Sequence, residues 1–277
     1  MNLTALVQTI RNLDGAWGKR WPGLPLVYGA CVHQLNGQAS VGTQSARIRS
    51  LLGAGEAVAQ RIERMGRAAA AQKNEPAYHS RLHTATTLVS LTALLLAQRQ
   101  VEHPATQGLR PSEARMLLAM VAHDAGHPGR INTVTHELEG ASYELVAPLL
   151  KKHGVNSEDA RAVKDIILST DPRVGAQHYQ TAHKTTCSTQ RLAWQRLFVQ
   201  EADVLASALP QLQAELTRQL AKEWAKFNKK AAAGLLKPSG RLGFLEGGTR
   251  FSTPAARSMG IDKLVAKQIA AIRTSGT

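Results

Sequence analysis

The 277-residue sequence has few aromatic residues and almost no cysteine. Phe, Trp and Tyr make up 4% of the chain, which leaves few rings for stacking on the bases of RNA or single-stranded DNA. The two cysteines, Cys31 and Cys187, exclude a disulfide framework and share no metal-ligand spacing. We therefore expect a reduced, cytoplasmic protein.

Long apolar runs are also missing. The most apolar stretch, residues 88–97, is about half of the roughly 20 residues that a membrane-spanning helix needs. Residues 1–20 lack a charged segment followed by an apolar run, so they do not resemble a signal peptide. No membrane partner is expected.

Acidic residues are outnumbered by basic ones, 20 against 34, and the net charge is +14. Such an excess attracts anions, which include nucleotides and nucleic acids. The basic residues are dispersed along the chain, which favours a soluble basic surface over a dedicated nucleic-acid groove. A small nucleotide fits this charge, and nucleic acid is not the expected partner.

Hydrophobic periodicity predicts an all-α fold. Apolar residues recur at helical spacing from about residue 44 onwards, and no alternating strand pattern with hairpin turns is present. The predicted helices cover about residues 1–13, 46–71, 80–100, 111–122, 135–153, 157–170, 187–208 and 211–232, with a last helix after Pro254. Two Gly- and Pro-rich stretches are expected to be irregular, an ordered one at 14–43 and a long loop at 234–254. We expect residues 1–43 to pack on a compact multi-helix domain, residues 44–277.

Two histidine motifs stand out from this helical pattern. His79 and His83 are four residues apart, which places both side chains on one face of a helix. Taken alone, that spacing is common among exposed or core histidines. The pair His123-Asp124 ends a strongly apolar helix, where a carboxylate is costly unless a cation or several donors lie nearby.

Asp203 is a third unusual residue, because it lies in an apolar run. A salt bridge to a basic residue would explain Asp203 by itself. Together with His83, His123 and Asp124, however, it completes a set of nitrogen and oxygen ligands that suits Zn, Fe, Mn or Mg.

The order of these motifs resembles the HD superfamily of metal phosphohydrolases, and within it the catalytic domain of class I cyclic-nucleotide phosphodiesterases. The resemblance covers roughly residues 75–250. It is carried by Tyr78-His79…His83, His123-Asp124…His127-Pro128-Gly129…Asn132, Ile167-Leu168-Ser169-Thr170-Asp171 and Ala202-Asp203.

The resemblance implies a site with two divalent metal ions. It assigns the first metal to His83, His123, Asp124 and Asp203, with Asp124 bridging to the second. Hydrogen bonds to water on the second metal would come from His127, Glu139 and Thr170, where Glu137 is a rival to Glu139. His79 would be the general acid.

The substrate side of the site shows departures from the family. Tyr78 and Asn132 are expected near the substrate. Gly126 stands where the family commonly has a second acidic residue. Gly243-Phe244 matches part of the family's base pocket, but Arg241 replaces a glutamine there, and its donor-only guanidinium would favour guanine. Phe244 would either clamp the base or pack in the core.

The expected function is hydrolysis of a 3′,5′-cyclic nucleotide, such as cyclic AMP or cyclic GMP, to the 5′-monophosphate. Two metals would activate a bridging water, and a histidine would protonate the leaving oxygen. Two alternatives stay open: an HD hydrolase that acts on another nucleotide phosphoester, and a non-catalytic nucleotide or nucleic-acid binder. The oligomeric state is left open.

Overall fold

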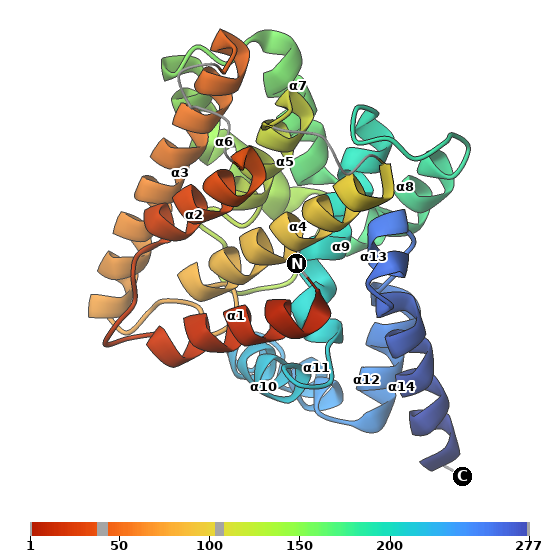
Figure 1. Ribbon diagram of the computed structural model, residues 1–277. Coiled ribbons are helices and arrows are strands. Elements are labelled where there is room, and N and C mark those ends of the chain that lie inside the picture. Colours follow the sequence, from red (N-terminus) through yellow and green to blue (C-terminus); the bar gives the residue numbers. More distant parts are fainter. Residues whose placement is uncertain (1, 38–43, 103–107, 276–277) are drawn as a thin grey trace.

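The computed structural model describes residues 2–37, 44–102 and 108–275. Across these ranges every regular element is a helix and no strand is present, which confirms the all-α prediction. The elements up to the middle of the chain (Figure 1) are α1 (Leu3–Ala16), α2 (Leu24–Asn36), α3 (Ala46–Ala71), α4 (Arg81–Glu102), α5 (Pro111–Ala122), α6 (Glu137–Lys152) and α7 (Ser157–Leu168). The remaining elements are a 3-10 turn η2 (Pro172–Val174), α8 (Gly175–Ala182), α9 (Leu192–Ala208), α10 (Gln213–Trp224), α11 (Lys229–Leu235), α12 (Pro238–Gly243), a π-helical turn η3 (Phe244–Gly248), α13 (Pro254–Ser258) and α14 (Ile261–Ser275).

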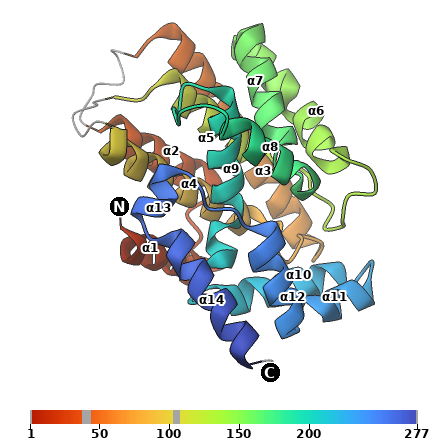
Figure 2. The same ribbon diagram turned by 90° about the vertical axis from the view of Figure 1, so that its right-hand side faces the viewer.

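Two central helices, α4 and α5, form the middle of the core. α5 is buried along its whole length from Ser112 to Ala122, as its unbroken apolar sequence predicts. α4 packs against α1, α2, α5, α9 and α13, and α5 packs against α3, α7 and α9. Figures 1 and 2 both place α10, α11 and α12 at the lower end of the molecule, below these central helices.

The N-terminal segment differs from its prediction. Residues 14–43 were expected to be an ordered loop, but α2 occupies Leu24–Asn36, and residues 38–43 lie outside the described part of the chain. Gly23, at φ +94°, turns the chain into α2, and Pro25 sits in the first turn, where a missing N–H costs no intrahelical bond. Glycine and proline therefore mark the start of a buried helix here.

The C-terminal third also departs from expectation. The single helix expected at 211–232 is split into α10 and α11, because the Asn228 side chain accepts the N–H of Ala231 at 2.9 Å and starts a new helix. The loop expected at 234–254 contains α12 and η3, with Pro238 in the first turn of α12.

Two further boundaries were wrong. The helix expected from residue 187 begins at Leu192, and the segment before it contains α8, which was not predicted. The last helix is two helices, because Gly260 has φ +73° between α13 and α14.

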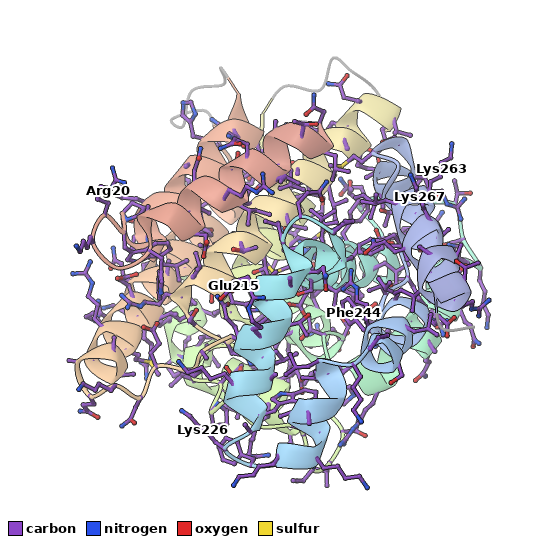
Figure 3. All side chains as sticks on the ribbon, turned by 90° about the horizontal axis from the view of Figure 1, so that it is seen from below. Arg20, Glu215, Lys226, Phe244, Lys263 and Lys267 are labelled. Atoms are coloured by element: carbon purple, nitrogen blue, oxygen red, sulfur yellow. The ribbon has the colours of Figure 1, made fainter. Side chains whose placement is uncertain are left out.

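The surface charge is spread out, as the dispersed sequence positions predict. Seen from below, Arg20, Lys226 and Lys263 lie at separate edges of the molecule (Figure 3). Within the described residues, no helix has both the length and the apolar character that crossing a bilayer requires.

A buried ion pair ties the two central helices together. Arg99 of α4 bonds Glu113 of α5 through two contacts, at 2.7 and 2.5 Å, and also donates to the carbonyl oxygens of Leu35 and Gly108 at 2.6 and 2.9 Å. Both side chains are almost fully buried. The pair therefore fixes α5, which carries His123 at its end.

We expect Glu113→Ala to lower the free energy of unfolding by about 3–5 kcal/mol, because it leaves the Arg99 charge buried without its carboxylate. Urea unfolding measures this loss. Glu158→Ala is the control, since Glu158 is 71% exposed in its pair with Arg47 and such pairs contribute about 0–1 kcal/mol. Equal losses in the two variants would show that the buried pair has no special role.

Candidate metal centre

The four residues expected to bind a metal come from the three most buried helices. His83 lies in the first turn of α4, His123 and Asp124 directly follow α5, and Asp203 lies on α9. His79 precedes α4, which begins at Arg81, so the expectation that His79 and His83 share a helical face was wrong. Their rings are nevertheless 5.5 Å apart.

The structure brings His83, His123, Asp124 and Asp203 into one cluster. One possible ligand atom from each lies within 4.8 Å of all the others. Nε2 of His83 is 3.2 Å from Asp124 Oδ2 and 3.2 Å from Asp203 Oδ1, and Nε2 of His123 is 3.1 and 3.3 Å from the same two oxygens. Two imidazoles thus converge on the same two carboxylate oxygens.

Neither Nε2 atom of this cluster forms a hydrogen bond, although both are buried. On His123 the other ring nitrogen, Nδ1, lies 2.7 Å from the carbonyl oxygen of Met120. A carbonyl only accepts, so Nδ1 carries the proton and a neutral ring presents a lone pair at Nε2. A lone pair that faces two carboxylates is repelled by them unless a proton or a cation lies between.

The electrostatics of the cluster fit a divalent cation. Burial alone would lower the pKa of His83, but the contacts with Asp124 and Asp203 outweigh it and raise the pKa to about 9. The same carboxylates raise the pKa of His123. Two carboxylates and two neutral imidazoles balance a 2+ charge, and this donor set suits Zn, Fe, Mn or Mg. These side chains therefore fit a metal ion.

A second group shares Asp124 with the first. It consists of His79, Asp124 and His127, again within 4.8 Å of one another. Nδ1 of His127 accepts the N–H of Gly129 at 3.0 Å, so the proton of a neutral ring lies on Nε2. Burial, and next the neighbouring His79, lower the pKa of His127 to about 4. His127 is therefore a neutral donor, suited to hydrogen-bonding a water or an anionic oxygen.

Glu223, a residue that the sequence analysis missed, holds His79. Its Oε1 is 2.5 Å from Nδ1 of His79, and its Oε2 accepts the backbone N–H groups of Tyr78 and His79 at 2.8 and 3.0 Å. Its side chain is 1% exposed. Glu223 is the only acidic residue between positions 216 and 245, and this isolation is the one feature of the sequence that singles it out.

Gly129 leaves room for the Glu223 side chain. A Cβ at this position would lie 2.9 Å from Cγ of Glu223, and the backbone has φ +79°. Both constraints require glycine. The Pro128-Gly129 turn after the His-Asp motif thus lets α10 approach the cluster.

Glu139 and its rival Glu137 have different surroundings. Glu139 is buried and accepts two hydrogen bonds from Nδ2 of Asn132, at 3.0 and 2.9 Å. Burial raises its pKa, and the carboxylates of Asp171 and Asp124 add to this. Glu137 instead pairs with Arg130 and caps the Thr133 backbone at the surface. Of the two, Glu139 is the one whose surroundings include Asp124.

Asn132 and Thr170 make local contacts. Besides contacting Glu139, Asn132 accepts the N–H of Leu138 through Oδ1 at 2.8 Å, so its amide positions the start of α6. The hydroxyl of Thr170 donates to the carbonyl of Ile167 at 2.8 Å, and Thr170 lines a cavity that reaches Asp203.

The three remaining substrate residues gather at the end of α9. Tyr78 shares a hydrogen bond of 2.9 Å with the Ser207 hydroxyl and lines a cavity together with His83 and Asp203. Arg241 donates to the carbonyl oxygens of Ser207 and Ala208 at 2.6 and 3.2 Å, and to the Gln268 side chain at 2.7 Å. Its guanidinium therefore caps α9.

Phe244 packs next to Arg241. The guanidinium carbon of Arg241 is 5.4 Å from the centre of the Phe244 ring. The cavities that include Asp203 or Asp124 are lined by neither residue. The base-binding role that the resemblance implies for Arg241 and Phe244 stays a prediction.

A comparison with protein-family models gives no match, and none of the curated proteins matches the sequence.

Chelation should make the stability of the protein depend on pH. Without metal, imidazolium contacts with the carboxylates stabilise the fold. Because the folded-state pKa of His83 is raised from 6.5 to about 9, this contribution is complete below pH 6.5 and is lost as pH rises through 9. With metal bound, both imidazoles are already neutral.

The measurement is thermal unfolding between pH 6 and 10, once with EDTA and once with Mn²⁺. We expect Tm to fall between pH 6.5 and 9 only in the chelated protein. If Tm changes with pH by the same amount in EDTA and in Mn²⁺, the result contradicts a metal bound by His83.

Proposed function

We propose that the protein is a metal-dependent phosphodiesterase that hydrolyses a 3′,5′-cyclic nucleotide to the 5′-monophosphate. One observation carries the proposal: a histidine held by a buried carboxylate lies directly beside a four-residue metal-ligand cluster. His79 and Asp124 offer atoms within 4.8 Å of each other, and Glu223 contacts Nδ1 of His79.

The ligand cluster has a clear role in this reaction. His83, His123, Asp124 and Asp203 would hold one divalent ion, and Asp124, which also belongs to the second group, would contribute to holding a second ion. Bound metal ions would activate the attacking water and offset the charge of the phosphoryl oxygens.

His79 would supply the proton for the leaving group. The Glu223 carboxylate accepts the proton on Nδ1, so the proton that His79 can donate is on Nε2. A 3′-alkoxide leaves poorly unless its oxygen is protonated as the P–O bond breaks. The contact with Glu223 also fixes the orientation of the His79 ring, as in other carboxylate–histidine pairs.

His127 would assist as a neutral donor. Its ring stacks on that of His79 at 3.7 Å, and its low pKa keeps it uncharged. Its Nε2–H can donate to an anionic oxygen without competing for the metal. The preference for a cyclic nucleotide over another phosphoester is supported by the order of the motifs, which resembles the class I phosphodiesterases.

His79→Ala should keep its metal and lose about 10²–10⁴-fold in kcat on a cyclic nucleotide, because only the proton donor is removed. The loss should be smaller for a p-nitrophenyl phosphodiester, whose leaving group needs no proton. Steady-state kinetics with metal analysis of the same samples measures both.

His83→Ala is the matched control, since it removes a ligand four residues away. It should lose both metal and activity toward every substrate. If His79→Ala loses as much metal as His83→Ala, His79 is a ligand and the acid role is wrong. Absence of nucleotide hydrolysis by the metal-loaded wild type would refute the proposed reaction itself.

A further inference from the structure

A cavity opens from the metal cluster toward α8. Its lining includes Asp203, Thr170 and Asp171. Tyr179 of α8 and Arg250, in the segment after η3, contribute to its lining. Tyr179 and Arg250 belong neither to the metal cluster nor to the contacts of His79. In a chain with 4% aromatic residues, a tyrosine in a cavity that reaches a metal ligand is a notable feature.

The Tyr179 ring is held in place. It stacks on the ring of His183 with centroids 4.1 Å apart and an angle of 27° between the planes. His183 in turn contacts the ring of Trp194, which belongs to a small buried cluster with Ala182 and Leu197. The guanidinium carbon of Arg250 lies over the Tyr179 ring, 5.5 Å from its centre. The Tyr179 ring therefore packs against His183 and lies beneath the Arg250 guanidinium.

Buried hydrogen bonds fix the segment that carries Arg250. The Glu201 carboxylate accepts the N–H groups of Ser252 and Thr253 at 2.6 and 2.9 Å and the Thr253 hydroxyl at 2.6 Å. Glu201 is two residues from Asp203 on α9, so the same helix holds both the metal cluster and the wall of the cavity. Arg250 itself is exposed.

Two glycines, Gly247 and Gly248, leave this wall of the cavity open. A Cβ on Gly247 would meet nothing within 4 Å, whereas one on Gly248 would meet the Phe244 ring at 3.2 Å. Phe244 therefore packs against the glycine wall and does not line the cavity itself. The open space is bounded by backbone, the Tyr179 ring and the Arg250 guanidinium.

We propose that this cavity is the nucleobase site, in which the base stacks on Tyr179 beneath Arg250. The inference deepens the proposed function, which supplies the phosphate position at the metal cluster. A base between the Tyr179 ring and the Arg250 guanidinium needs about 3.5 Å on each side, or about 7 Å in total. The present separation is 5.5 Å, so Arg250 moves outward by roughly 1.5 Å when the base enters. Bases stack on aromatic rings and on arginine regardless of sequence, so both purines and pyrimidines fit this site.

Equilibrium binding tests the base site without requiring turnover. Calorimetry with the Mn²⁺-loaded protein compares 5′-AMP with ribose 5-phosphate, which lacks only the base. We expect the wild type to bind 5′-AMP about 5- to 150-fold more tightly, the range that stacking of one base provides. Tyr179→Leu should abolish this difference and Tyr179→Phe should keep it.

Tyr143→Leu is the matched control. Tyr143 on α6 also lies under a cation, with Lys164 Nζ 5.0 Å from its ring centre, but it lines none of the cavities at the cluster. This variant should keep the full preference for 5′-AMP. Gly247→Val provides a second test that leaves the aromatic cluster intact, because Gly247 lines the cavity and an added Cβ there meets no atom within 4 Å. It should weaken 5′-AMP binding more than ribose 5-phosphate binding.

The outcomes separate this inference from the proposed reaction. Loss of the 5′-AMP preference in Tyr179→Leu and Gly247→Val supports the base site, even if no cyclic nucleotide is hydrolysed. A preference that persists in both variants overturns the base site, even if the wild type hydrolyses cyclic nucleotides. A wild type that binds both ligands equally well also overturns it.

Discussion

At the centre of the fold, the Nε2 atoms of His83 and His123 point at the oxygens of Asp124 and Asp203 without making a hydrogen bond. Because the second nitrogen of His123 already contacts a carbonyl, the neutral ring presents a lone pair to two negative charges. Burying such an arrangement is costly unless something positive lies between the groups. A divalent cation would satisfy all four side chains at once.

Three helices place their ends or side chains at this cluster. His83 lies in the first turn of α4, His123 directly follows the end of α5, and Asp203 lies within α9. A buried pair, Arg99 with Glu113, locks α4 to α5 away from the site. α10 then brings Glu223 to His79, so a helix outside the core positions His79 while the core helices position His83, His123 and Asp203.

Much of this was predictable from sequence. The all-α class follows from helical periodicity. The grouping of His83, His123, Asp124 and Asp203 was expected from the order of the motifs, because the His79/His83 spacing and Asp203 each have common explanations when taken alone. Glycine and proline misled the prediction at α2 and α12, because Pro25 and Pro238 begin helices instead of breaking them. Glu223 was missed because contact between residues 144 positions apart leaves no local pattern. Arg241 aligns with a family motif, yet the carbonyl oxygens that bind its guanidinium are set by how α9 ends, which the motif does not encode.

The central claim is that these four side chains share a metal ion. X-ray diffraction from crystals grown with Mn²⁺, recorded with anomalous scattering, tests it most directly. We predict an anomalous peak within coordination distance of His83 Nε2, His123 Nε2, Asp124 and Asp203, with a second peak about 3.5–4 Å away on the other side of Asp124. Density that shows the imidazoles hydrogen-bonded directly to the carboxylates, with no anomalous peak between them at saturating Mn²⁺, would contradict the account.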